Sequence, residues 1–146
     1  METINHECYV SLEVAKLLKE VGFDWKCNGV FLSEDGTQYA FIKADAACDN
    51  NNSKYNPYNI SAPTIEVAQR WLRVVKGIYI GITAIENKRA VTNSDGWTFH
   101  YEYGKPTFDC DIQDERCENM CTLYDSFDTY EEALEVGIKK ALEIIL

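Results

Sequence analysis

The stretch FDCDIQDERCENMC, residues 108–121, concentrates side chains that are suited to chemistry. It contains three of the six cysteines and five carboxylates, namely Asp109, Asp111, Asp114, Glu115 and Glu118. Thiolates are ligands for zinc, and clustered carboxylates are ligands for calcium. A pair of carboxylates can also act as a general acid and a general base. We therefore consider three interpretations: a metal site, a catalytic site, and an anionic surface that binds a partner.

The residue spacing argues against a metal site. Cys110, Cys117 and Cys121 are separated by six and three residues, which matches no zinc-ribbon pattern, and CxxC does not occur in the chain. Residues 109–113 begin like an EF-hand calcium loop. However, Asp114 stands where that loop needs glycine, and Met120 where it needs a bidentate glutamate. We predict no cofactor and no structural metal, and a weak acidic cation site of another geometry stays open.

Covalent catalysis needs a base beside the nucleophile, and the chain has two histidines to serve as one. His6 falls in residues 1–8, which we expect to be a frayed N-terminus. His100 falls on the polar side of the alternating segment WTFHYEY, so we expect it on a solvated sheet face. The chain contains no GxSxG, P-loop, GxGxxG or HExxH motif. An enzyme is therefore the alternative hypothesis: a small carboxylate- or metal-dependent hydrolase that uses residues 109–118.

The net charge of −10 is concentrated in one part of the chain. Residues 109–135 contain ten acids and one base, Arg116. A surface of this sign repels phosphate backbones, so we expect no direct nucleic-acid binding, and it attracts a basic protein partner. The N-terminus has no signal-peptide pattern and no apolar run is long enough to span a membrane, so we expect no membrane association and a cytoplasmic protein. In that compartment cysteines are expected to be buried, reduced thiols.

The segment CDNNNSKYNPYN, residues 48–59, is a long polar loop that carries Tyr55 and Tyr58. Exposed tyrosines on an adaptable loop are typical of recognition surfaces, because they supply rigid amphipathic area. The alternative is that both rings fold back onto the domain. Long loops without regular structure are often functional or disordered, so both interpretations are kept.

The elements that must position these residues follow from periodicity and capping. Apolar residues at helical spacing predict helices at 11–21, 61–77 and 128–146, with Ile65, Ala68, Leu72 and Val75 as the inner stripe of the second. Alternation and two Asp-Gly turns predict strands at 25–32, 39–44, 78–86, 97–103 and 107–113. Cys117, Met120, Cys121 and Tyr124 have the spacing of a short buried helix. The predicted order is α-β-β-α-β-β-β-α.

Consecutive hairpins predict an antiparallel sheet of four to five strands, with about three helices on one face. The 146 residues are a usual size for one domain, so we expect a single α+β domain over 1–146. The sequence does not indicate an oligomeric state.

Three segments, YVSLEVAKLLKEVGFDWKC (9–27), SAPTIEVAQRWLRVVKGIYI (61–80) and SFDTYEEALEVGIKKALEIIL (126–146), resemble a family of small uncharacterised proteins. That family comes from gut Bacteroidetes genomes, their prophages and mobile elements. The resemblance implies a phage-like or mobile-element origin and no established activity. The leading hypothesis is therefore a non-enzymatic accessory protein. It would bind a protein partner through the loop residues Tyr55 and Tyr58 and the five carboxylates of 109–118.

Overall fold

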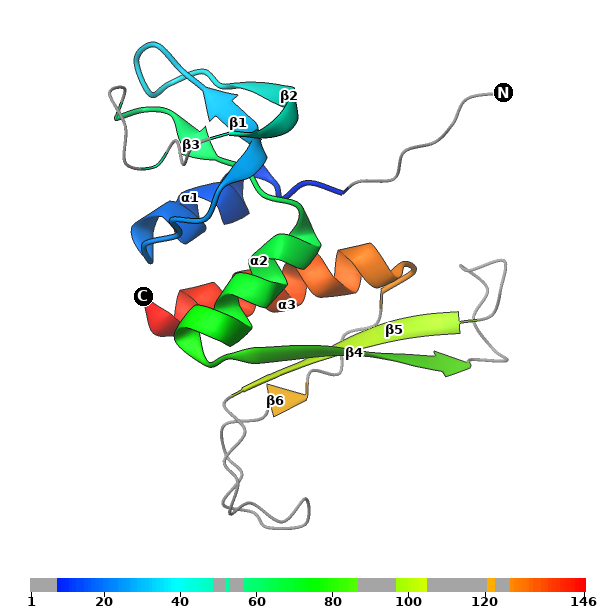
Figure 1. Ribbon diagram of the computed structural model, residues 1–146. Coiled ribbons are helices and arrows are strands. Elements are labelled where there is room, and N and C mark those ends of the chain that lie inside the picture. Colours follow the sequence, from blue (N-terminus) through cyan, green and yellow to red (C-terminus); the bar gives the residue numbers. More distant parts are fainter. Residues whose placement is uncertain (1–7, 49–51, 53–56, 87–96, 105–120, 123–126) are drawn as a thin grey trace, which may run out of the picture. The chain divides into compact units, whose positions relative to one another are not determined.

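The computed structural model describes residues 8–48, 52, 57–86, 97–104, 121–122 and 127–146 (Figure 1). The chain divides into two compact units, Met1–Ala68 with Leu146, and Gln69–Ile145. Both are built from antiparallel strands and helices, which confirms the α+β class.

The first helix, α1 (Leu12–Glu20), forms where its capping signal predicts. The Ser11 hydroxyl accepts a hydrogen bond from the Val14 amide at 3.3 Å, which satisfies one of the donors left open in a first helical turn. Val14 and Leu18 are buried. Gly22 follows with φ of +94°, a conformation that glycine adopts without strain and that ends the helix.

The first sheet has the strand order β2-β1-β3. Its strands are β1 (Cys27–Leu32), β2 (Ala40–Cys48) and the short β3 (Ile60–Ser61). As the Asp-Gly signal predicts, β1 and β2 form a hairpin, and the turn glycine Gly36 has φ of +82°. The third strand was not predicted, because a two-residue strand carries no periodic signal.

Three backbone segments of this unit, around Val10, Gly29 and Ala62, lie very close together. The Ala62 amide donates to the Gly29 carbonyl oxygen at 2.9 Å, and the Val10 amide donates to the Pro63 carbonyl oxygen at 3.0 Å. A Cβ atom on Gly29 would lie 2.3 Å from the Ala62 carbonyl oxygen. Only glycine fits there, because other residues would push the two segments apart.

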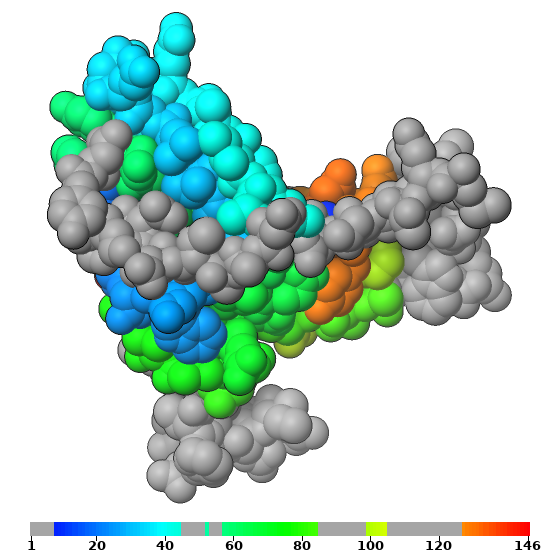
Figure 2. Space-filling model, turned by 45° about the horizontal axis from the view of Figure 1, so that its top comes forward, coloured from blue at the N-terminus to red at the C-terminus, as the bar shows by residue number. Residues whose placement is uncertain are grey.

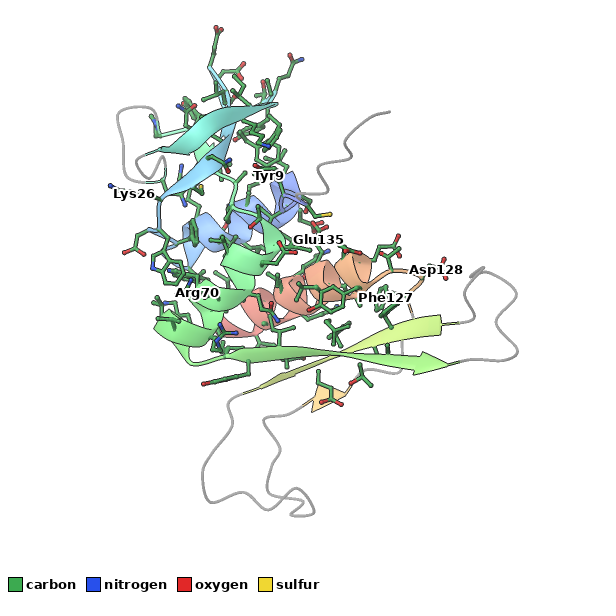
Figure 3. The ribbon with its side chains drawn as sticks, turned by 45° about the vertical axis from the view of Figure 1, so that its right-hand side comes forward. Tyr9, Lys26, Arg70, Phe127, Asp128 and Glu135 are labelled. Atoms are coloured by element: carbon green, nitrogen blue, oxygen red, sulfur yellow. The ribbon has the colours of Figure 1, made fainter. Side chains whose placement is uncertain are left out.

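The N-terminal end of the described chain is anchored to the same unit. The side chain of Tyr9 is labelled in Figure 3. Its hydroxyl donates to Asn28 Oδ1 at 3.0 Å, and its ring lies 5.0 Å from the ring of Phe41. The Cys8 carbonyl oxygen accepts a hydrogen bond from the Ile65 amide at 2.9 Å. Residues 1–7 lie outside the described part of the chain.

The second helix begins where Pro63 and Thr64 predict, but it winds differently than the sequence predicts. Its α-helical part, α2 (Ile65–Trp71), starts after Thr64, whose hydroxyl accepts from the Val67 amide at 3.3 Å. A π-helical segment, η2 (Leu72–Lys76), completes it and ends at Gly77 with φ of +69°. The prediction that Val75 belongs to the inner stripe is wrong: its side chain is 48% exposed. A π turn holds more residues than an α turn, so Val75 does not return to the face of Leu72.

Besides the end of α2 and η2, the second unit contains a three-stranded sheet with a further helix on its face. Its strands are β4 (Tyr79–Glu86), β5 (Trp97–Gly104) and β6 (Cys121–Thr122), in the order β4-β5-β6. The helix α3 (Tyr130–Ile145) packs against β4 and β5. It continues through Gly137, where a Cβ atom would lie 3.0 Å from Ile80 Cγ2 and 3.2 Å from Tyr101 Cβ. This glycine therefore allows the helix and the sheet to approach closely.

Three predictions about the fold need correction. In place of a single sheet of four to five strands, the described residues form two sheets: β3 pairs with β1 in the first, and β6 pairs with β5 in the second. The order α-β-β-α-β-β-β-α accordingly gains a strand before α2. Cys121, predicted in a short helix, lies in β6 opposite Tyr103, where strand pairing satisfies its backbone. The strand predicted at 107–113 lies outside the described residues.

None of the helices in the described part of the chain has the length and apolarity needed to cross a bilayer.

Candidate functional site

The tip of the β1–β2 hairpin forms one wall of an open recess of about 590 Å³. The turn stands out from its own unit (Figure 2). The residues that line the recess are mostly polar and come from the hairpin and from the end of the tyrosine loop: Leu32, Ser33, Glu34, Asp35, Gln38, Tyr39, Ala40 and Asn59. We use the name hairpin-tip surface for Glu34, Asp35, Gln38, Tyr39, Tyr58 and Asn59.

The turn itself is held by its own side chains. Asp35 Oδ1 accepts hydrogen bonds from the Thr37 amide at 2.9 Å and from the Thr37 hydroxyl at 2.7 Å. The Ser33 hydroxyl accepts from the Gly36 amide at 2.8 Å. The hydrogen bonds from Thr37, first from its amide and then from its hydroxyl, hold the pKa of Asp35 below its ordinary value. The carboxylate is therefore charged at neutral pH and fixed in direction.

Tyr58 lies against this turn. A Cβ atom built on Gly36 would meet Tyr58 Cδ1 at 2.8 Å, so the ring rests on the glycine backbone. The side chain nevertheless stays 42% exposed. One part of the Tyr58 ring is thus supported by the hairpin, and another part faces solvent.

The backbone that carries Tyr58 is fastened by helix α1. The Lys19 ammonium donates to the carbonyl oxygens of Pro57 and Asn59, the second at 3.1 Å. The Lys16 ammonium lies 5.1 Å from the centre of the Tyr39 ring, within cation–π range. Both cations therefore engage acceptors of the same unit.

Two asparagines complete the support. Asn59 Oδ1 accepts from the Ser33 amide at 3.4 Å. Asn52 Nδ2 donates to the Phe23 carbonyl oxygen at 3.0 Å, and its Oδ1 accepts from the Ser61 amide at 2.9 Å. No pattern in the sequence singles out Lys19, Asn52 or Asn59. Their partners lie between 9 and 40 residues away, so no local pattern identifies them.

The chemistry of the hairpin-tip surface is that of recognition. It offers two exposed carboxylates, two carboxamides and the faces of two tyrosines. Carboxylates attract ammonium and guanidinium groups, and tyrosine faces attract them through the ring quadrupole. Its supporting contacts are hydrogen bonds to backbone groups, so the surface is formed before any ligand arrives.

Of the site residues predicted from sequence, Tyr58 is the one that falls in the described part of the chain. Tyr55, Asp109, Asp111, Asp114, Glu115 and Glu118 lie outside it. The acids of the alternative hydrolase hypothesis are therefore outside it too. His100 lies on β5 opposite Thr83, on the sheet face away from buried Tyr101, as the alternation predicts. The described residues contain no group of three or more histidine, cysteine or acidic side chains arranged to hold a metal.

A second surface, of opposite charge, lies on η2 and the end of α2. We call it the valine ridge: Arg70, Arg73, Val74, Val75 and Lys76. Val74 is 61% exposed, and Arg73 is exposed beside it. The Lys76 ammonium lies 5.6 Å from the centre of the Trp71 ring. Figure 3 labels Arg70, which is exposed on α2. The π winding that moves Val75 off the core face produces this ridge.

Comparisons with protein-family models, with curated proteins and with solved structures find no match to this chain. The resemblance to a mobile-element family, drawn from three segments, stays a prediction. The function is therefore inferred from the geometry of the hairpin-tip surface.

Proposed function

We propose that this protein is a non-enzymatic binding protein whose hairpin-tip surface recognises a cationic segment of a partner protein. The observation that carries the proposal is the placement of Tyr58. Its ring is seated on Gly36 and 42% exposed, in the same turn whose Asp35 carboxylate is fixed and charged. In keeping with the family resemblance, the role would be that of a phage-like or mobile-element accessory protein.

The proposed ligand follows from the charges and shapes on this surface. A lysine or arginine side chain could place its charged head near Asp35 and its apolar stem along the Tyr58 ring. Such a contact uses both halves of the surface at once. The acidic segment 109–118 would add longer-range attraction for the same class of partner.

The rigidity of the surface supports a binding role. Lys19 holds the backbone on both sides of Tyr58, and the hairpin turn is closed by Asp35 and Ser33. A surface that is ordered beforehand loses less conformational entropy when it binds, so more of the contact energy appears as affinity.

The experiment is a selection of random ten-residue peptides displayed on phage against the full-length protein. We expect the enriched peptides to contain lysine or arginine, and a Tyr58→Ala variant to bind them about tenfold more weakly. The matched control is Tyr79→Ala, because Tyr79 is a similarly exposed tyrosine, at 46%, on β4. Binding should also weaken as salt is raised from 50 to 500 mM.

Two results would contradict the proposal. One is an enriched set of peptides with no excess of cationic residues. The other is an equal loss of affinity in the Tyr58→Ala and Tyr79→Ala variants, which would mean that the hairpin-tip surface is not the contact.

A further inference from the structure

The valine ridge is a basic and apolar surface on an acidic protein. Residues 69–79 contain three bases and no acid, in a chain whose net charge is −10. Arg73, Val74, Val75 and Lys76 follow one another in η2, the helical segment that leads into β4 (Figure 1), and all four are exposed. The ridge therefore presents two apolar side chains that are flanked in sequence by two cations.

The winding of η2 presents these side chains together. A π turn holds more residues than an α turn, so consecutive side chains are separated by a smaller rotation and lie closer to one face. The amides of Gly77 and Ile78 both donate to the Leu72 carbonyl oxygen, the second at 3.0 Å, which closes the turn. Single π turns within helices are frequent at functional sites. The ridge is therefore an ordered surface of a kind that is often used for binding.

Several other cations of the described chain are engaged with neighbouring groups. The Lys16 ammonium lies over the Tyr39 ring, and Lys19 donates to backbone carbonyl oxygens. Lys139 and Lys140 form ion pairs on α3 with Glu143. On the valine ridge, by contrast, the cations lie beside valines that are 61% and 48% exposed. The ridge thus combines the two properties, positive charge and exposed apolar area, that the hairpin-tip surface is proposed to recognise.

The hairpin-tip surface is complementary to the ridge in charge and in shape. Its turn carries the exposed carboxylates of Glu34 and Asp35, and Leu32 and Ala40 contribute apolar lining to the open recess of about 590 Å³. Recesses of this volume hold small groups that need a largely apolar lining with a few polar side chains. Exposed valines suit the recess, and cations beside them suit carboxylates on its edge.

We propose that the cationic segment recognised by the hairpin-tip surface is the valine ridge of a second copy of this protein. This inference rests on the proposed function and names the partner. The two surfaces differ, so the contact is heterologous: each copy gives its ridge to one neighbour and its hairpin tip to another. Such an assembly grows beyond two copies, as an open chain or as a closed ring.

The association is expected to be weak and dependent on concentration. One turn of helix against one hairpin buries a small area, which is typical of transient contacts. The net charge of −10 makes the copies repel each other at long range. At about 0.15 M salt the Debye length is about 8 Å, so that repulsion is largely screened, whereas charges in direct contact still attract. The test is therefore made at this ionic strength.

The experiment is analytical ultracentrifugation of the full-length protein from about 10 μM to 1 mM, a range suited to a weak contact. A reducing agent is present, so that no disulfide between copies contributes. We expect the average mass to rise with concentration. Tyr58→Ala, at the hairpin tip, and Arg73→Glu, on the ridge, should each weaken the association about tenfold or more. Lys140→Glu is the matched control, because it makes the same change of charge on an exposed lysine of α3.

A mixture of the two variants tests whether the two surfaces bind each other. Tyr58→Ala keeps an intact ridge, and Arg73→Glu keeps an intact hairpin tip. We expect each variant to stay monomeric by itself and an equimolar mixture to form a dimer that does not grow further. Circular dichroism of each variant checks that it is folded, and the Lys140→Glu protein should associate as the wild type does.

Three results would overturn the inference: a wild type that is monomeric throughout, an association that either variant leaves unchanged, or a mixture of the variants that does not form a dimer. If the wild type is monomeric but the selected cationic peptides bind at Tyr58, the proposed function stands and its partner is another protein. If no cationic peptide binds there, the proposed function itself is rejected. The selected peptides should also dissociate the wild-type assembly, because they compete for the same hairpin tip.

Discussion

The hairpin-tip surface and the valine ridge both expose apolar side chains, but they do so for different reasons. At the hairpin tip, Tyr58 rests on a glycine and its backbone is fastened by Lys19. On the valine ridge, a change of helical winding turns Val74 and Val75 outward from an otherwise amphipathic helix. The tip is acidic, whereas the ridge is basic. Exposure by itself is therefore weak evidence of function, and the contacts that hold a side chain in its exposed position are stronger evidence.

The largest predicted effect tests the origin of the valine ridge. Leu72 is fully buried and Val75 is half-exposed, although they are three residues apart and both were predicted on the inner stripe. We expect Leu72→Ala to cost about 2–5 kcal/mol of unfolding free energy, and Val75→Ala less than about 0.5 kcal/mol. Urea denaturation followed by circular dichroism measures both. Equal costs would mean that the helix is α-helical to its end, with Val75 in the core.

The second prediction tests the backbone that supports the hairpin tip. Gly29→Ala would place a Cβ atom 2.3 Å from the Ala62 carbonyl oxygen, so the two segments must separate. We expect the free energy of unfolding to fall by about 1–3 kcal/mol, which is typical of an overpacked site, and urea denaturation measures it.

The matched control is Gly81→Ala, on β4. A Cβ atom there would meet nothing within 4 Å. We expect this variant to be neutral or slightly stabilised, because alanine restricts the unfolded chain more than glycine does. A Gly29→Ala protein as stable as the Gly81→Ala protein would show that the close approach at Gly29 is not maintained in solution.

The third prediction concerns the fastening of the tyrosine loop. Lys19→Met keeps most of the apolar stem but removes the donor to the Pro57 and Asn59 carbonyl oxygens. We expect the free energy of unfolding to fall by about 1 kcal/mol and the backbone amides around Tyr58 to exchange hydrogen faster. Lys140→Met is the control, because Lys140 forms an exposed ion pair with Glu143 at 3.7 Å, of a kind that contributes little to stability. Unchanged exchange around Tyr58 in Lys19→Met would remove Lys19 from its supporting role.

The sequence predicted those features that depend on neighbouring residues, such as helix caps and tight turns. The Ser11 cap, the Asp-Gly turn and the helix stop at Gly77 form as predicted, since each depends on residues within one or two turns. The winding after Trp71 was not predictable in this way. A sequence stripe assumes α geometry, whereas packing in the fold determines where a π turn forms.

The candidate site was predictable in its residue type but not in its construction. Tyr58 was selected because a tyrosine in a polar loop favours recognition. Its support on Gly36 joins residues far apart in the chain, and no local pattern encodes that contact. The same holds for the strand register beyond Gly29, because the shift between Cys27 and Gly29 breaks the simple hairpin count from the Asp-Gly turn.

The smallest predicted effect is the pH dependence of the Asp35 turn. The folded pKa of Asp35 lies below its unfolded value because Thr37 donates two hydrogen bonds to the charged form. Its contribution to stability is therefore complete above the unfolded pKa, about 3.9, and is lost as the pH falls through the lower folded pKa.

Asp35→Asn keeps an acceptor oxygen for Thr37 but does not titrate. We expect the stability difference between the two proteins to be constant from pH 5 to 7 and to shift against the wild type below about pH 4. Thermal melts in matched buffers measure it, and a difference that stays constant down to pH 2.5 would show that the Thr37 hydrogen bonds do not favour the ionised carboxylate.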